Sequence, residues 1–275
     1  MIGKLFLVAT PIGNLDDMTF RAIKTLKDVD LIAAEDTRHT LQLLNHFEIS
    51  KPMISYHRHN EETKSNMLIE KLKGGQNIAL VSDAGTPGIS DPGLEVVKEA
   101  IKENIEIVPI PGACAFVNAL IASGLDTTEF SFIGFLPLNK KNRKEKIDFI
   151  KKCTQTVILY EAPHKVKNTL NDLKDILEDR KVVLARELTK IHEQFIRGTV
   201  QEILDKIGEP RGEYVISIQG AKPTESDVGL ELNSLDVQEH YKFYEKQGYS
   251  KKDIIKMVAK DRNVHKNDIY KLFLD

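Results

Sequence analysis

The chain has 275 residues, of which 41% are hydrophobic and 29% are charged, and its formal net charge is −2. This length exceeds one average domain, and the near-zero charge argues against a basic field that covers the whole protein. Two cysteines, Cys114 and Cys153, are too few for a disulfide framework and form no CxxC metal motif. Because we find no apolar run typical of a signal peptide or a membrane span, we expect a cytoplasmic protein.

Short apolar runs alternate with helix-period segments in the first half of the chain. The runs at 4–10, 30–35, 77–82 and 105–110 predict strands, and the segments at 19–29, 39–47 and 94–104 predict helices. Strands that are apolar on both faces and separated by amphipathic helices are typical of a mostly parallel sheet covered by helices. We therefore expect an α/β domain over residues 1–128.

The alternation of apolar runs and helix-period segments resumes after an extended connector at 130–137. It predicts strands at 156–162 and 181–187, a helix at 164–177 and a further strand at 212–220. We assign residues 129–222 to a second α/β domain.

Residues 223–275 differ in composition, and we expect an acidic linker followed by a basic domain of helix-turn-helix type. Residues 224–239 hold five acidic and no basic residues, whereas 240–275 hold nine Lys and Arg against five Asp and Glu. Ser250 is the expected N-cap of the second helix. A further basic run, 140–152, has seven Lys and Arg against two acids. Each basic patch is equally compatible with a solvated helix face.

The stretch VSDAGTPGISDPG at 81–93 follows an apolar strand and combines glycine, proline and aspartate without any Lys or Arg. It has neither the lysine of a P-loop nor the GxGxxG spacing of a dinucleotide site. Glycine and proline let a stiff backbone approach a ligand closely, and the acidic residues favour hydroxyl groups or positive charge. S-adenosylmethionine (SAM) offers both, although a purely structural turn is the alternative. Similar turns at 8–15 and 108–115 follow other strands, and ligands bind at the carboxyl ends of parallel strands.

Six motifs together are similar to the ribosomal RNA small subunit methyltransferase I family: TPIGNL, AAEDTRHT, ALVSDAGTPGISDPG, PIPGACA, GFLP and LARELTK. The match runs from about residue 4 to 220, and the basic C-terminal segment resembles the small helical domain that the family often carries. The resemblance implies two α/β domains of the tetrapyrrole methylase type (class III methyltransferases), with SAM in the cleft between them. It also implies 2′-O-methylation of a cytidine in the decoding region of 16S ribosomal RNA, and a homodimer. No set of residues in the sequence resembles a metal site, so we expect catalysis without a metal.

The resemblance also assigns the residues of the SAM site. The turn after the first strand and the glycine-rich acidic turn are expected to form two walls, the small residues of PIPGACA to hold the methionine end, and the second domain to close the site. The expected residues are Thr10, Pro11, Asp83, Ala84, Gly85, Thr86, Pro87, Gly112, Ala113, Cys114, Ala115, Tyr160, Gly212 and Glu213.

For catalysis, the resemblance implies Asp36 as the base or as the group that orients the ribose hydroxyl. Glu161 is a second candidate, because LYEAPHK places it at a strand end that faces the cleft. The alternatives are a helix N-cap with a surface ion pair for Asp36 and a helix-start cap for Glu161. The expected RNA contacts are Asn14, Arg38, His39, His59, Asn60, Arg186 and Lys190. A tetrapyrrole methyltransferase and a non-catalytic RNA-binding protein remain as alternative functions, and the basic runs favour RNA.

Overall fold

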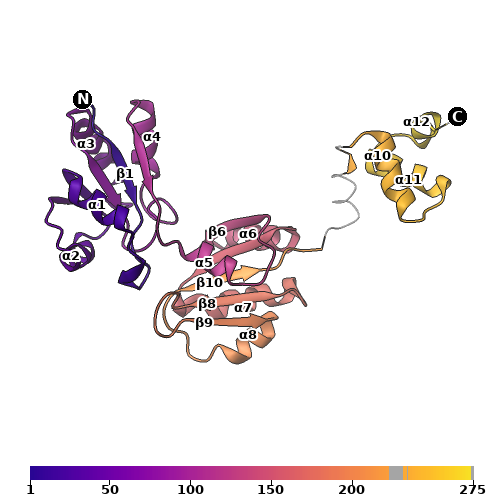
Figure 1. The fold of residues 1–275 in the computed structure, drawn as a ribbon. Helices are drawn as coiled ribbons and strands as arrows, with labels where there is room; N and C mark the ends of the chain where they lie inside the picture. The colour runs from indigo at the N-terminus through magenta and orange to yellow at the C-terminus, as the bar shows by residue number, and fades with distance from the viewer. Residues whose placement is uncertain (223–231, 234, 274–275) are drawn as a thin grey trace. The chain divides into compact units, whose positions relative to one another are not determined.

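The computed structural model describes residues 1–222, 232–233 and 235–273. The chain divides into two compact units, Met1–Gly220 and Ala221–Asp275. The first holds two five-stranded sheets, and the second is helical within its described residues (Figure 1). The predicted α/β architecture with C-terminal helices is confirmed. The boundary at residue 128 stays a prediction, and much of the predicted acidic linker (223–231 and 234) lies outside the described residues.

The first sheet is entirely parallel, with the strand order β3-β2-β4-β1-β5. Its strands and helices are β1 (Leu5–Val8), α1 (Phe20–Asp28), β2 (Leu31–Ala34), α2 (Thr37–His46), β3 (Met53–Ser55), α3 (Glu61–Lys73), β4 (Ile78–Val81), α4 (Leu94–Lys102) and β5 (Ile107–Ile110). Leu31 and Ala33 belong to one hydrophobic cluster, whereas Ile32 and Ala34 belong to another. Both faces of β2 are therefore buried, as its continuous apolar sequence predicts.

The second sheet has the order β6-β7-β10-β8-β9, and only β6 and β7 pair in parallel. The expected connector at 130–137 is largely an edge strand of this sheet. The elements of this half are α5 (Ala115–Ile121), β6 (Phe130–Phe135), α6 (Lys140–Lys152), β7 (Thr156–Glu161), α7 (Pro163–Leu177), β8 (Val182–Arg186), β9 (Gln194–Gly198), α8 (Val200–Lys206) and β10 (Tyr214–Ile218). Helix α5 packs on this sheet through Ala119 and Leu120, so it joins the two sheets in one unit.

The C-terminal unit contains α10 (Val237–Lys246), α11 (Lys251–Asp261) and α12 (Lys266–Lys271). They enclose a small core that includes Ile254, Val258 and Ile269. The hydroxyl of Ser250 accepts a hydrogen bond from the backbone of Asp253, which confirms the predicted N-cap. None of the helices in the described ranges has the length and apolar character needed to cross a membrane.

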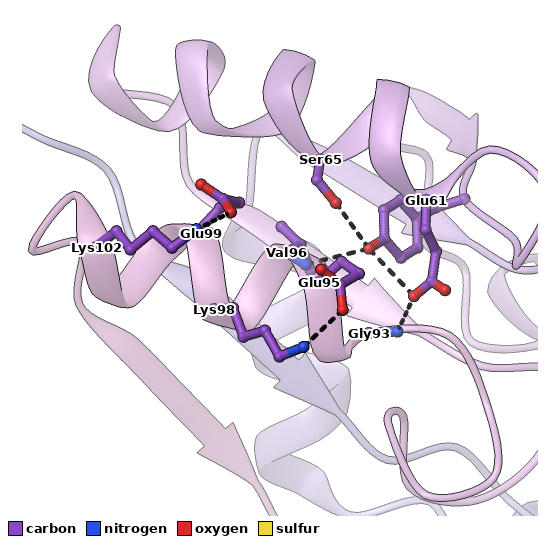
Figure 2. Close-up of polar contacts among 9 residues, drawn as sticks. Glu61, Ser65, Gly93, Glu95, Val96, Lys98, Glu99 and Lys102 are labelled. Atoms are coloured by element: carbon purple, nitrogen blue, oxygen red, sulfur yellow. Dashed lines mark hydrogen bonds and ion pairs between the residues drawn. The ribbon is translucent and has the colours of Figure 1, made fainter.

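A buried tyrosine anchors the far end of the acidic turn (Figure 2). The hydroxyl of Tyr56 shares a hydrogen bond of 3.0 Å with Ser65 and accepts one of 3.3 Å from the backbone of Val96. Beside it, the Oε1 of Glu61 accepts a 2.8 Å hydrogen bond from the backbone of Gly93. These contacts join α3 to the first turn of α4, and they hold the turn where it enters the helix.

We expect Tyr56→Phe to lower the free energy of unfolding by about 1–3 kcal/mol, because it leaves the buried amide of Val96 without its acceptor. Lys98→Ala is the control, since Lys98 forms an exposed ion pair with Glu95 and its removal changes stability by about 0.5 kcal/mol. Urea unfolding followed by circular dichroism measures both. Equal effects of the two changes would contradict the anchoring role of Tyr56.

Candidate functional site

The glycine-rich turn after β4 folds back against the loop after β1. The backbone of Thr10 and that of Gly85 exchange two hydrogen bonds, of 2.8 and 3.0 Å, and form an isolated antiparallel bridge. The buried hydroxyl of Thr10 also donates to the carbonyl of Ser82 at 3.2 Å. Thr10 therefore positions the turn.

Two further hydrogen bonds connect the turn to the other strand ends of the first sheet. The hydroxyl of Thr86 donates to the carbonyl of Ala113 at 3.1 Å, in the loop after β5. The Oδ1 of Asp83 accepts a 2.9 Å hydrogen bond from the backbone of Asp36, after β2. Because parallel strands end at the same edge of the sheet, four separate loops become one rigid assembly.

Glycine is required where the turn meets its neighbours. Gly85 has a φ of +80°, and a Cβ there would lie 3.2 Å from the Cγ2 of Ile12. A Cβ on Gly112 would lie 2.9 Å from the Cβ of Ala9. Gly88 has a similar φ of +82°, but a Cβ there would meet nothing within 4 Å. A side chain at Gly85 or Gly112 would therefore be crowded by its neighbours, whereas there is space for one at Gly88.

A cavity of about 290 Å³ opens beside this turn and is closed by residues of the second sheet. Eight of the residues expected to bind the cofactor line it: Asp83, Ala84, Gly85, Thr86, Cys114, Ala115, Tyr160 and Glu213. Six others do not line it, namely Thr10, Pro11, Pro87, Gly112, Ala113 and Gly212. Of these six, Thr10 and Ala113 hold the loops that carry the lining residues.

Sequence reasoning missed half of the cavity wall. The additional lining residues are Ile12, Glu35, Ile89, Ser90, Asp91, Phe135, Glu187, Leu188, Tyr214 and Val215. Most of them lie inside the motifs already singled out, so the sequence pointed to the right segments but not to these side chains. Glu35 is the neighbour of the selected Asp36, and Asp91 lies in the same turn as Asp83. The register of the strands decides which of two adjacent acids faces the cavity, and the motif alone does not contain that information.

The cavity wall is strongly acidic. Six carboxylates line it, against the single cation of Lys190, which is itself paired with Glu187 at 3.1 Å. The carboxylates are those of Glu35, Asp83, Asp91, Glu161, Glu187 and Glu213. Such a wall attracts a cation or a group with hydroxyl donors and repels a polyphosphate.

Asp91 is the most perturbed of these acids. Burial and then the negative charge of Glu35 raise its pKa to about 7, with smaller contributions in the same direction from Asp83 and Glu213 and an opposing one from Arg58. Burial, followed by the charge of Asp83, also raises the pKa of Glu35. A carboxyl group in this range exchanges its proton near neutral pH.

Tyr160 and Cys114 form an uncharged part of the wall. The hydroxyl of Tyr160 accepts a 3.2 Å hydrogen bond from the backbone of Phe116 at the start of α5, and the ring packs edge-on against Phe132 and Phe135. Burial raises the pKa of both the phenol and the Cys114 thiol. Both groups therefore stay protonated at neutral pH, which agrees with a packing role for Cys114.

Asp36 lies at the N-terminus of α2 and does not line the cavity. Its Oδ1 accepts a 2.8 Å hydrogen bond from the backbone of Arg38, and its Oδ2 pairs with the Arg38 guanidinium at 2.9 Å. The hydrogen bonds to Arg38 lower the pKa of Asp36 to about 2. The geometry is thus that of a helix cap with an exposed ion pair, and a carboxylate of this pKa is a weak proton acceptor.

Glu161, in contrast, is buried and faces the cavity. Its Oε1 accepts from the backbone of Ala162 at 2.9 Å, and its Oε2 accepts from the hydroxyl of Thr169 at 2.6 Å. Thr169 in turn accepts from Arg143 of the basic helix α6, whose guanidinium also binds Asp172. This chain of contacts fixes the Glu161 carboxylate. It also means that Arg143, one of the seven Lys and Arg residues of the predicted basic run, is bound within the protein.

The residues expected to contact RNA are dispersed. Asn14 caps a short 3-10 helix (Leu15–Asp17), and the Oδ1 of Asn60 accepts from the backbone of His57. The His39 and His59 side chains are exposed. The buried Nε of Arg186 has no partner among the described residues, and only Lys190 reaches the cavity. Across the described ranges, no group of three or more His, Cys, Asp or Glu side chains is arranged to hold a metal ion.

Comparison with known proteins agrees with this fold. The model of the family described as tetrapyrrole (corrin/porphyrin) methylases matches residues 4–204. Diphthine synthase has a similar structure, with a TM-score of 0.65 and 15% identity, over 79% of this chain and 90% of that one. A uroporphyrin-III C-methyltransferase from Thermus thermophilus, complexed with S-adenosyl homocysteine, has a TM-score of 0.55 and 16% identity, over 79% and 97% of the two chains. The chain is a member of the tetrapyrrole methylase family.

A more similar relative narrows the family. A protein of Halalkalibacterium halodurans named ribosomal RNA small subunit methyltransferase I is 51% identical over 273 residues, which cover 98% of this chain and 94% of the relative. The chain therefore belongs to the ribosomal RNA small subunit methyltransferase I family and is a methyltransferase. The family membership predicted from the six motifs is confirmed.

The raised pKa of Asp91 predicts a pH dependence of stability. Its folded-state pKa of about 7 lies above the unfolded value of 3.8, so the folded protein holds this proton more tightly. The corresponding stability is complete below the unfolded pKa and is lost as the pH rises to about 7. We expect Asp91→Asn to flatten this decline and to stabilise the protein above neutrality. Urea unfolding at a series of pH values measures the free energy of unfolding of both proteins. If it declines with pH in the variant as it does in the wild type, groups other than Asp91 cause the decline.

Proposed function

We propose that the protein transfers a methyl group from SAM to the 2′-hydroxyl of a cytidine in the decoding region of 16S ribosomal RNA. The observation that carries the cofactor assignment is the acidic cavity at the carboxyl ends of the first sheet, next to a turn without side-chain bulk. The names of its relatives support ribosomal RNA as the substrate, and the basic run of α6 agrees with it. As the motifs imply, we propose that the active form is a homodimer.

The residues present fit SAM. The carboxylates suit its sulfonium charge and its ribose diol, and the absence of a Cβ at Gly85 leaves room for a ligand against the backbone. Asp83, Gly85 and Thr86 would hold one side of the cofactor, and Cys114, Ala115 and Tyr160 the other. SAM supplies a methyl group on a good leaving group, so the protein mainly has to align the acceptor and to exclude water.

The proton of the ribose hydroxyl needs an acceptor near the cavity. We propose Asp36 as a group that orients the hydroxyl, since its low pKa leaves it ionised and able to accept a hydrogen bond at neutral pH. Glu161 lines the cavity, and we propose it as the second catalytic candidate. Arg38 has an 89% exposed side chain that pairs with Asp36 at 2.9 Å, and we propose that its exposed guanidinium also contacts a phosphate of the RNA.

Gly85→Ala tests the cofactor site. Both Gly85→Ala and Gly88→Ala place a side chain at a positive φ, at a cost of about 1 kcal/mol each, but only the first brings a methyl group against Ile12. We expect Gly85→Ala to weaken SAM binding about tenfold or more in calorimetry, and Gly88→Ala to change it little. Wild-type protein that gives no heat with SAM would remove the proposed cofactor altogether.

Asp36→Asn tests the catalytic assignment. Asn is also a good N-cap, so α2 is retained. We expect turnover on small-subunit RNA to fall about tenfold or more while SAM affinity is unchanged. Asp17→Asn, an exposed carboxylate on the 3-10 helix, is the matched control. Loss of SAM affinity in parallel with turnover would make Asp36 a structural residue instead.

Ribose-methylation mapping of ribosomal RNA from cells without the gene tests the substrate. We expect an undermethylated cytidine in the decoding region and an unchanged tetrapyrrole pool. An altered tetrapyrrole pool would favour the small-molecule methyltransferase, the function of several proteins of this fold. SAM binding without any methyl transfer would favour a non-catalytic RNA-binding protein.

A further inference from the structure

The C-terminal unit carries a lysine groove between α11 and α12. The groove has a volume of about 570 Å³, and four lysines, one amide, one aromatic ring and one aliphatic side chain line it: Lys251, Lys252, Ile255, Lys256, Lys266, Asn267 and Tyr270. Among the described residues, no carboxylate lines the groove. Helices α11 and α12 form this part of the unit in Figure 1.

The charges of the lysine groove are poorly compensated. Lys256 lies 3.8 Å from Asp253, and Lys251 donates to the carbonyl of Phe273 at 2.9 Å, which carries no net charge. Within the described part of the chain, the side chains of Lys252 and Lys266 make no hydrogen bond or ion pair. Four cations that share one groove repel each other, and a ligand with several negative charges relieves that repulsion.

The other lining groups narrow the class of ligand. The side chain of Tyr270 is about half exposed, so its ring is available for stacking, and Asn267 offers an amide that can donate and accept hydrogen bonds. Lysines that follow a backbone of phosphates, beside an aromatic ring for a base, are typical of sites that bind single-stranded nucleic acid. A free phosphate or a lipid headgroup would use the lysines and leave the ring without a partner.

We propose that the lysine groove binds an unpaired segment of the substrate RNA, with Lys252 and Lys266 on its phosphates and Tyr270 stacked on a base. This inference rests on the proposed function for the identity of the RNA. It adds a second site, on a separate unit from the cavity, whose task is to retain the substrate. The lysine groove takes no part in the methyl transfer to the ribose.

The test uses the full-length chain and a labelled oligonucleotide of the small-subunit decoding region. We expect Lys252→Ala/Lys266→Ala to weaken binding and to reduce the slope of log K against log salt by about 1.5, because two phosphate contacts are lost. Lys242→Ala/Lys246→Ala removes the same charge from exposed positions of α10 and is the matched control. If both double variants reduce the slope equally, the effect is one of net charge and the groove assignment is wrong.

The stacking contact is tested separately. Tyr270→Ala is expected to weaken RNA binding about tenfold, and Tyr270→Phe to restore it, because the ring suffices for stacking. Failure of Tyr270→Phe to restore binding would overturn the stacking contact. Circular dichroism of each variant checks that the helices remain folded.

Methyl transfer and SAM affinity distinguish this inference from the proposed function. If the groove is correct, the variants raise KM for RNA while SAM affinity stays at the wild-type value. If wild-type protein binds RNA through the groove without methylating it, the proposed function fails and the groove stands. If the variants bind free RNA normally and lose activity only on assembled subunits, the groove contacts a ribosomal protein, and the inference is wrong.

Discussion

The pairing of Thr10 with Gly85 is the constraint on which the rest of the site depends. Two backbone hydrogen bonds close the glycine-rich turn onto the loop of the neighbouring strand, and this closure requires a positive φ at Gly85. Once the turn is fixed, Asp83 and Thr86 lie where they can reach the loops after β2 and β5. Glycine and threonine thus act by geometry, and they determine where the acidic side chains of the turn point.

The acidic wall is held together against its own repulsion. Glu35, Asp83 and Asp91 repel one another, and this repulsion adds to burial, the larger cause, in raising the pKa of Asp91. Hydrogen bonds from the backbone and from Arg58 to the Ser90 carbonyl keep the turn in place despite this repulsion. A cationic ligand with hydroxyl groups relieves the repulsion on binding, so the same residues that destabilise the empty fold contribute affinity for the proposed methyl donor.

The sequence predicted four of the five strands of the first sheet, but it did not predict which side chains line the cavity. Strands apolar on both faces, such as β2 and β4, are typical of a parallel sheet, and the proline- and glycine-rich turns identify the loops at its edge. Strand β3 has three residues, and α3 shows little periodicity, so neither gave a usable pattern. In the second sheet, β6 has a mixed burial pattern, and only one residue of β9 (QFIRG) is buried. Strands β8 and β10 are as apolar as those of the first sheet, but they pair antiparallel with each other. Which side chains reach the cavity depends on the conformation of the loops that follow the strands, and the motifs do not contain that information. For this reason Asp91 and Glu187 were not predicted to line it.

The near-zero net charge conceals the fact that acidic and basic residues gather in different parts of the chain. The cavity wall collects carboxylates from loops of both sheets, whereas lysines gather on α6 and in the lysine groove of the C-terminal unit. A cationic cofactor and a polyanionic substrate demand opposite potentials, and one surface cannot provide both within a Debye length of about 8 Å. Under the proposed function this conflict is avoided by a division of residues, because the lysines that would hold phosphates are not among those that line the cavity. This division also explains why a basic binding surface for RNA is compatible with a chain whose overall charge is −2.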